Sequence, residues 1–363
     1  MAFSIQRYMT GGVYRVITDA LRATGGSPKQ KAFYKSFAAA ATRATAKRFR
    51  SEKQGEHVPA FLIASITSAC NLHCAGCYSR ENHACSDEAP VKQMTADEWD
   101  RIFREASEIG ISFILLAGGE PLLRKDVVER AANHRDILFP IFTNGVFLND
   151  QYLGIFDENR NLLPVISIEG SETVTDARRG KGVYRKVIDT MLRLREKQIA
   201  FGASITVTKE NMREVFSTDF LGRLGAFGCK AVIFVEYVPM AEESDALAPG
   251  AGERVFMEER LKELRRHNRD MVFISFPGDE KRSGGCVAAG RGFFHINSHG
   301  GAEPCPFSPF SDVNVREGSL KDALRSPLFR ALQDTGILTE DHEGGCTLHK
   351  FRDEVEALAA MNA

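Results

Sequence analysis

"LIASITSACNLHCAGCYSR", residues 62–80, is the stretch that decides the fold, because it places three cysteines directly after an apolar run. The run is typical of a buried strand, and Cys70, Cys74 and Cys77 follow it within eight residues. Thiols at this spacing can form disulfides, hold zinc with His73 as a fourth ligand, or hold a redox cluster. The rest of the sequence has to distinguish these alternatives.

The whole chain has the composition of an ordinary globular protein, with 363 residues, 43% apolar and 26% charged. No apolar run reaches the length of a membrane span, and the first residues lack the features of a secretory signal. We therefore expect a cytoplasmic protein. Eight cysteines are too few for a disulfide-dense scaffold of this size. In a cytoplasmic protein, clustered cysteines more often bind metal or take part in chemistry.

Strand-like and helix-like patterns alternate from Pro59 onward. Runs such as "FILLAGG" and "VIFVEYV" are apolar at consecutive positions, as expected of strands covered on both faces. Because such strands are joined by crossovers, the pattern predicts an α/β fold with a parallel sheet, either a barrel or an open doubly wound sheet. The expected strands are 60–67, 111–117, 139–142, 163–169, 201–208 and 231–238, with helices at 96–109, 127–134, 184–197 and 217–227.

The alternation of strand-like and helix-like runs ends after the sixth expected strand. Residues 241–253 are small, acidic and interrupted by Pro and Gly, which indicates a linker before a helix at 254–267. "RGFFHINSHGGAEPCPF", residues 291–307, predicts a hairpin, because a Ser-His-Gly-Gly turn separates two strand-like runs. Helices at 319–332 and 352–361 are expected to follow.

Cys-x3-Cys-x2-Cys after the first strand, with Gly118-Gly119-Glu120-Pro121 after the second, resembles the radical S-adenosylmethionine superfamily over residues 58–240. The resemblance implies a partial (βα)6 barrel of the TIM type. It also implies a [4Fe–4S] cluster on the three cysteines, whose fourth iron binds S-adenosylmethionine. The family often has an aromatic residue just before the third cysteine, whereas this chain has Gly76 there and Tyr78 just after. That departure leaves open which side chain covers the cluster.

The same resemblance assigns the residues that would bind S-adenosylmethionine. Gly118, Gly119 and Glu120 would hold its amino group. Ser167 and Glu169 would bind the ribose hydroxyls. The methionine carboxylate is assigned to Arg179, with Arg178 as a competitor of equal chemistry. Further residues expected to face the cofactor are Asn144, Ser204 and Thr206.

The activity that the resemblance implies is radical chemistry. An external reductant of the flavodoxin or ferredoxin type would supply one electron, S-adenosylmethionine would be cleaved, and the resulting 5′-deoxyadenosyl radical would remove hydrogen from an unactivated carbon. The motifs of the barrel do not identify the substrate, and we favour a lipid or a peptide. No catalytic residue is assigned. The alternative is a non-catalytic adaptor that binds zinc or an iron–sulfur cluster and whose basic N-terminus binds a membrane or nucleic acid.

A second cysteine set, Cys286, Cys305 and Cys346, resembles the shortened twitch form of the SPASM domain. That domain carries an auxiliary [4Fe–4S] cluster, although a zinc knuckle stays open as an alternative. Cys85 and Cys229 are left over, and we expect Cys229 to be a core thiol. The domains are then a helical extension at 1–57, the barrel at 58–245, and a linker helix with the auxiliary-cluster domain at 246–363. Candidates for a fourth cluster ligand are His295, His299, His342 and His349.

The N-terminal extension is basic, since residues 1–57 carry eleven Lys or Arg against three Asp or Glu. Residues such as Phe33, Phe37 and Ala41 fall on one helical face. Two readings stay open. The apolar face can pack on the barrel, or it can lie on an anionic membrane, which would favour a lipid substrate and peripheral localisation. The basic residues of the second reading are Arg43, Lys47, Arg48, Arg50 and Lys53.

Overall fold

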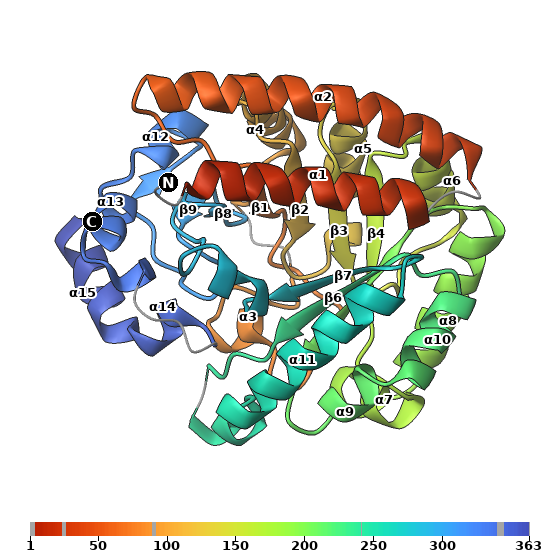
Figure 1. Cartoon of the computed structure of the whole chain (residues 1–363). Coiled ribbons are helices and arrows are strands. Elements are labelled where there is room, and N and C mark those ends of the chain that lie inside the picture. The colour runs from red at the N-terminus through yellow and green to blue at the C-terminus, as the bar shows by residue number, and fades with distance from the viewer. Residues whose placement is uncertain (1–3, 24–26, 89–91, 241, 340–344, 363) are drawn as a thin grey trace.

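The computed structural model describes residues 4–23, 27–88, 92–240, 242–339 and 345–362 (Figure 1). Its strands form one sheet with the linear order β10-β9-β8-β1-β2-β3-β4-β5-β6-β7. Neighbouring strands from β1 to β7 are parallel, as the alternating pattern predicts. The result is an α/β fold with a partial barrel. The strands are β1 (Phe61–Ser65), β2 (Phe113–Ala117), β3 (Phe139–Thr143), β4 (Leu162–Ser167), β5 (Gly202–Val207), β6 (Ala231–Glu236), β7 (Val272–Phe276), β8 (His295–Ile296), β9 (Gly301–Glu303) and β10 (Val313–Asn314).

The helices between the strands follow the apolar periodicity of the sequence. Helix α4 begins with a capping box between Thr95 and Glu98 and ends at Gly110, which adopts the left-handed conformation. Its apolar side, including the fully buried Trp99, packs against the sheet. The helices of the barrel are α3 (Tyr78–Glu81), α4 (Ala96–Ile109), α5 (Lys125–Asn133), α6 (Asp150–Glu158), α7 (Glu172–Arg179), α8 (Val183–Glu196), α9 (Met212–Val215), α10 (Thr218–Ala226) and α11 (Ala251–His267).

The C-terminal segment joins the barrel through its hairpin. Strands β8 and β9 are antiparallel, which confirms the expected hairpin, and β8 also pairs in parallel with β1. The hairpin therefore continues the barrel sheet at the β1 edge. At the other edge, β7 is a strand that the sequence patterns did not indicate. The remaining helices are α12 (Leu320–Leu324), α13 (Pro327–Asp334), α14 (Thr347–Lys350) and α15 (Arg352–Asn362), with short 3-10 turns at Pro121–Leu123, Glu242–Leu247, Gly278–Arg282 and Ile337–Thr339.

Two N-terminal helices, α1 (Ile5–Ala23) and α2 (Pro28–Lys53), cover the barrel (Figure 1). The ring of Phe37 on α2 meets the ring of Phe113 on β2 edge to face, with centroids 5.5 Å apart. Val13 and Ile17 of α1 belong to the same apolar cluster. Helix α1 also packs beside β7. The apolar face of the extension is thus used inside the protein, as the first of the two readings expects.

Arg48 contradicts the reading in which it contacts a membrane. Its side chain is 0% exposed and donates hydrogen bonds to the Gly110 carbonyl at 2.5 Å and to the Ser112 hydroxyl at 3.3 Å. It therefore satisfies the carbonyl that ends α4, and burial lowers its pKa to about 10. Lys47 likewise donates to the Ser107 carbonyl at 2.8 Å. None of the helices that the structure describes is long and apolar enough to cross a membrane.

Candidate functional site

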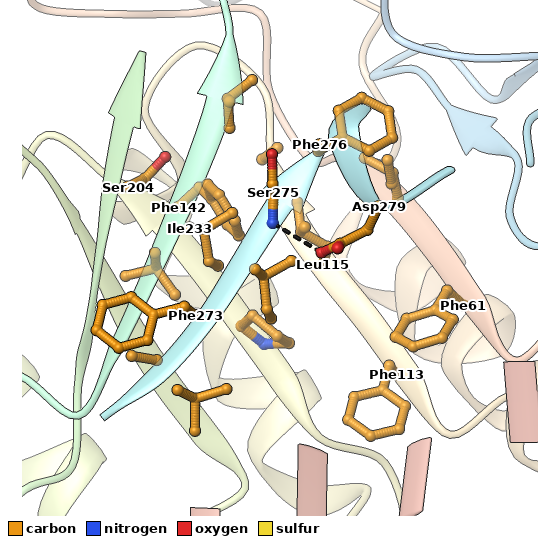
Figure 2. A pocket seen from close by; sticks show the side chains of 18 of the residues that line it. Phe61, Phe113, Leu115, Phe142, Ser204, Ile233, Phe273, Ser275, Phe276 and Asp279 are labelled. Atoms are coloured by element: carbon orange, nitrogen blue, oxygen red, sulfur yellow. Dashed lines mark hydrogen bonds between the residues drawn. The ribbon is translucent and has the colours of Figure 1, made fainter. Parts of the chain in front are cut away.

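A cavity of about 1330 Å³ runs through the barrel and ends at the cysteine loop. Its wall is largely apolar, and Figure 2 shows Phe61, Phe113, Phe142 and Ile233 around it. The volume exceeds the roughly 300–1,000 Å³ of a usual ligand pocket, so the cavity has room for more than one small molecule. The cavity brings together most of the residues that the sequence singled out, namely Cys70, Cys74, Cys77, Gly118, Gly119, Glu120, Asn144, Ser167, Arg178, Arg179, Ser204 and Thr206.

The cysteine loop is held from two sides by arginines. Arg80 donates to the Leu72 carbonyl at 2.9 Å, and the Ala75 amide donates to the carbonyl of Arg178 at 2.8 Å. Cys70, Cys74 and Cys77 are free thiols, each partly exposed. Burial raises the pKa of Cys74, while the nearby guanidinium groups of Arg179 and Arg178 act in the opposite direction. Positive charge beside exposed thiols suits the thiolate ligands of an anionic iron–sulfur cluster.

Cys85 lies next to this loop, where a hydrogen bond with its thiol raises the pKa of Cys70 and lowers that of Cys85 itself. Among the described residues, no group of three His, Cys, Asp or Glu side chains is arranged to hold a single metal ion.

Cys229 is buried and its Sγ lies 3.0 Å from the Ala231 carbonyl, which confirms it as a core thiol.

The glycine loop after β2 presses against the start of the cysteine loop. A Cβ at Gly118 would lie 2.2 Å from the Thr67 carbonyl oxygen, and one at Gly119 would lie 2.1 Å from that of Ala69. The Gly119 and Glu120 amides donate to the same two carbonyls at 2.8 Å. Only glycine permits this approach of two backbones, and Gly118 also needs a positive φ of 128°. The glycines thus bring the two loops together at the end of the cavity.

Glu120 anchors the glycine loop to the end of β3. Its side chain is 1% exposed and accepts hydrogen bonds from the Thr143 hydroxyl at 2.6 Å and from the amides of Leu122 and Asn144 at 3.0 and 2.8 Å. Burial raises its pKa, and these donors act against that rise. Asn144 in turn donates from Nδ2 to Asn71 of the cysteine loop at 2.8 Å. The expected contact of Glu120 with an ammonium group stays a prediction.

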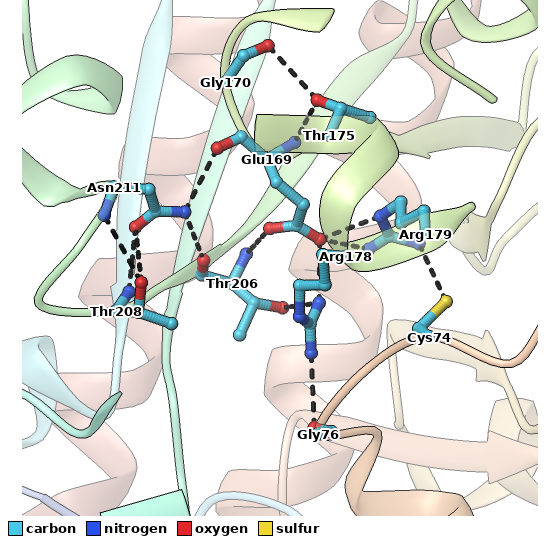
Figure 3. Close-up of polar contacts among 10 residues, drawn as sticks. All are labelled: Cys74, Gly76, Glu169, Gly170, Thr175, Arg178, Arg179, Thr206, Thr208 and Asn211. Carbon is cyan, nitrogen blue, oxygen red and sulfur yellow. Dashed lines mark hydrogen bonds and ion pairs between the residues drawn. The ribbon is translucent and has the colours of Figure 1, made fainter. Parts of the chain in front are cut away.

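Glu169 lies where two arginines meet, as Figure 3 shows. Its Oε1 accepts from Arg178 Nη1 at 2.8 Å, from Arg179 Nε at 2.8 Å and from Arg179 Nη2 at 2.5 Å. Its Oε2 accepts from the Thr206 amide at 2.9 Å. The side chain is 0% exposed and does not line the cavity. The ribose contact that we expected of Glu169 stays a prediction, and its carboxylate here accepts hydrogen bonds from both arginines.

Both arginines reach from Glu169 to the cysteine loop. Arg178 donates to the Gly76 carbonyl at 3.3 Å, and Nη1 of Arg179 lies 4.0 Å from Sγ of Cys74 (Figure 3). Burial alone would lower the pKa of Arg179, but the negative charge of Glu169 and of the thiolates raises it overall. Two cations share one anion here, so the site keeps a net positive charge beside the thiols. Ser167 and Ser204, which are paired in register on β4 and β5, line the cavity nearby.

Tyr237, directly after β6, is a site residue that the sequence analysis missed. It lines the cavity and is 3% exposed, and its buried hydroxyl has no hydrogen-bond partner among the described residues. A Cβ at Gly76 would lie 2.4 Å from that hydroxyl oxygen and 2.8 Å from a ring carbon. The ring therefore occupies the space that a larger side chain at position 76 would fill. No short sequence motif indicates that Tyr237 packs beside Gly76, because the two residues are far apart in the chain.

The second cysteine set is largely buried beneath the hairpin. Burial raises the pKa of Cys286, and Glu280, Cys346 and Cys305 raise it further, so these four groups lie close enough to interact. Tyr78 directly follows Cys77, and burial raises its pKa, with further contributions from Cys77 and Cys305, so it lies near both cysteine sets. Its ring packs on Phe307 with centroids 4.7 Å apart.

The histidines proposed as a fourth cluster ligand have different surroundings in the structure. His295 binds Glu303 and Ser65 through its two ring nitrogens, both at 2.7 Å, so it is already used. His299 is exposed, and burial lowers the pKa of His349. His342 lies outside the described residues. Glu280, which sequence reasoning missed, shares a hydrogen bond with Cys286.

Comparison with known proteins agrees with this geometry. Residues 64–220 match the model of the Radical SAM superfamily. The AdoMet-dependent heme synthase of Methanosarcina barkeri (strain Fusaro) is 27% identical over 82% of this chain and 90% of its own length. The PqqA peptide cyclase of Granulibacter bethesdensis is 25% identical over 81% of this chain and 83% of its own. The crystal structure of Streptococcus suis SuiB bound to S-adenosylmethionine has a TM-score of 0.68 at 18% identity, covering 86% of this chain and 78% of that one, which supports the fold.

Substitutions at Gly76 and Tyr237 test whether the Tyr237 ring occupies the space beside Gly76. Gly76→Phe should lower the free energy of unfolding by about 2–4 kcal/mol, because the new ring overlaps Tyr237 and the left-handed backbone disfavours a side chain. The Gly76→Phe/Tyr237→Gly variant should be about 1–2 kcal/mol more stable than the sum of the two single effects, which is the part due to overlap. Urea unfolding of the two single variants and the double variant measures the coupling. Strictly additive effects would show that the two residues do not compete for space.

Proposed function

This chain belongs to the radical S-adenosylmethionine superfamily and is an enzyme, and we propose that it abstracts a hydrogen atom from an unactivated carbon of a lipid or peptide. The observation that carries the proposal is the convergence of the cysteine loop, the glycine loop and two arginines at one end of a large cavity. When bound, the cluster and S-adenosylmethionine supply a one-electron reductive cleavage to methionine and a 5′-deoxyadenosyl radical, with the electron from an external flavodoxin or ferredoxin.

The residues of the site fit these two groups. Cys70, Cys74 and Cys77 are free thiols on one loop and would hold three irons. The glycine loop, fixed by Glu120, offers backbone groups to an ammonium, and Arg179 offers a guanidinium to a carboxylate. Ser167, Ser204 and Asn144 add hydroxyl and amide groups along the same wall. Tyr237 adds a buried hydroxyl with no partner among the described residues, which a bound molecule would satisfy.

The largely apolar wall beyond these polar groups supports a substrate with an unactivated carbon. Apolar walls bury a hydrocarbon substrate and keep water out of the space where it would lie. The relatives do not identify the substrate, because one is named for heme synthesis and another for peptide cyclisation. Contact with an anionic membrane through residues 1–57 has lost its main support, since the apolar face of α2 packs on β2.

We also propose that the C-terminal domain, which resembles the SPASM/twitch type, holds a second [4Fe–4S] cluster on Cys286, Cys305 and Cys346. The support is their mutual proximity and their place beside Tyr78, which links them to the first set. Glu280 is our candidate for a fourth ligand, because its charge raises the pKa of all three thiols. A carboxylate there would complete the site without any of the histidines.

Loss of a cluster ligand tests the activity. Anaerobically reconstituted protein should form 5′-deoxyadenosine when dithionite and S-adenosylmethionine are added, and Cys74→Ala should reduce this to the background of a protein-free control. The matched control is Cys229→Ala, which removes a core thiol that does not line the cavity. Product formation by Cys74→Ala at the rate of the unmodified protein would contradict the cluster assignment.

Iron analysis tests the second cluster separately. The reconstituted protein should contain about eight irons per chain, as two cubes of four require. A Cys286→Ala/Cys305→Ala variant should contain about half as much and still cleave S-adenosylmethionine. Four irons per chain in the unmodified protein would refute the second cluster without affecting the first.

A further inference from the structure

The cavity extends far beyond the cofactor end. It is lined at one end by the cysteine loop and Tyr237, which follows β6, and at the other by Lys230, which precedes β6. At about 3.3 Å per residue, the seven steps from Lys230 to Tyr237 cover about 23 Å. The cavity therefore spans the full length of a barrel strand. Helix α1 packs beside β7 and lines the same space with residues from Arg7 to Arg22.

The middle of this space is walled by inward-facing apolar side chains. Phe61, Phe113, Leu115, Phe142 and Phe273 surround it in Figure 2. Few polar groups interrupt the wall. The Ser275 amide, for example, already donates to Asp279 at 2.9 Å. A peptide lying here would leave backbone amides and carbonyls without partners, at a cost of about 1–3 kcal/mol each, whereas a hydrocarbon chain would not.

The end remote from the cysteine loop is positively charged. Lys230 precedes β6, Arg269 precedes β7, Arg266 is near the end of α11, and Arg15 lies on α1. None of their side chains forms an ion pair or a hydrogen bond within the described residues. Asp19, the acidic residue of α1 that lines the cavity, is already paired with Arg22 at 3.2 Å. Four cations are thus available to an anion at this end.

Two glycines of α1 line the cavity. Gly11, which is exposed, and Gly12, which is partly buried, lie inside the helix, and outside the helix's own backbone no atom lies within 4 Å of a Cβ built at either position. Glycine costs about 1 kcal/mol relative to alanine inside a helix. Because no close neighbour requires glycine here, the fold alone does not account for the pair. A larger side chain at the partly buried Gly12 would project into the space that α1 lines.

We propose that this part of the cavity binds an extended amphipathic anion. Its hydrocarbon chain lies along the barrel, its carboxylate or phosphate meets Arg15, Lys230, Arg266 and Arg269, and its far end reaches the cofactor site. The inference rests on the proposed function, because it names the class of molecule from which hydrogen is taken. It selects a lipid-like acid over a peptide. The length of the cavity fits a single long chain.

Binding to the reconstituted full chain tests the inference. The probe is cis-parinaric acid, a linear fatty acid that fluoresces in apolar surroundings, and its methyl ester is the neutral match. Hexadecyl phosphate and palmitic acid as competitors distinguish a phosphate from a carboxylate. Arg266→Gln/Arg269→Gln should weaken binding of the acid at least about tenfold and leave the ester unchanged. The control is Lys35→Gln, an exposed cation that does not line the cavity.

A second variant tests the open stretch beside α1. Gly12→Leu should reduce binding of both acid and ester at least about tenfold while the unfolding temperature stays equal or rises, because leucine favours the helix. Gly154→Leu is the control, since Gly154 is also helical with no atom within 4 Å of a Cβ but does not line the cavity.

The outcomes separate this inference from the proposed function. Unchanged affinity for the acid in Arg266→Gln/Arg269→Gln would overturn the charged end of the site. Absence of probe binding by protein that still forms 5′-deoxyadenosine would overturn the inference and leave the function standing. Binding that depends on both arginines, in protein that forms no 5′-deoxyadenosine, would support the anion site and contradict the proposed function.

Discussion

The carboxylate of Glu169 is the interaction on which the site depends. It has no exposure to solvent and is shared by Arg178, Arg179 and the Thr206 amide. A buried carboxylate without partners would cost several kcal/mol, so the four groups are fixed together. Through them the ends of β4 and β5 are tied to α7. The cysteine loop accepts a hydrogen bond from Arg178 at the Gly76 carbonyl, donates one from the Ala75 amide to the Arg178 carbonyl and lies beside Arg179, so it takes its position from this network.

The network also explains how the site can accept negative charge. Two guanidinium groups share one carboxylate, which leaves net positive charge beside Cys74. A cluster with thiolate ligands and a substrate carboxylate are both anionic, and the fixed cations lower the cost of bringing them together. At the opposite end of the barrel, a second group of cations has no such partner in the part of the chain that the structure describes. The cavity is therefore apolar along its length and basic at both ends.

Much of the fold follows from the sequence because its signals are local. Apolar runs predicted six strands, and the helices α4, α8 and α10 begin and end within one residue of the expected positions. The motif cysteines and glycines were found because the chemistry requires them at fixed spacing. What sequence reasoning missed depends on contacts between distant segments. Tyr237 fills the space beside Gly76, Arg48 is buried against Gly110, and Glu169 binds arginines, and no local pattern encodes these pairings.

Replacing Glu169 by glutamine tests the central claim most directly. The change keeps the shape but removes the charge that balances the two arginines, and breaking a buried pair costs about 3–5 kcal/mol. Equilibrium dialysis of S-adenosylmethionine against reconstituted protein, with iron content measured in the same samples, should show at least about tenfold weaker binding in Glu169→Gln. Glu172→Gln, which removes an exposed partner of Arg185, should behave as the unmodified protein. Unchanged iron content and affinity in Glu169→Gln would contradict the account.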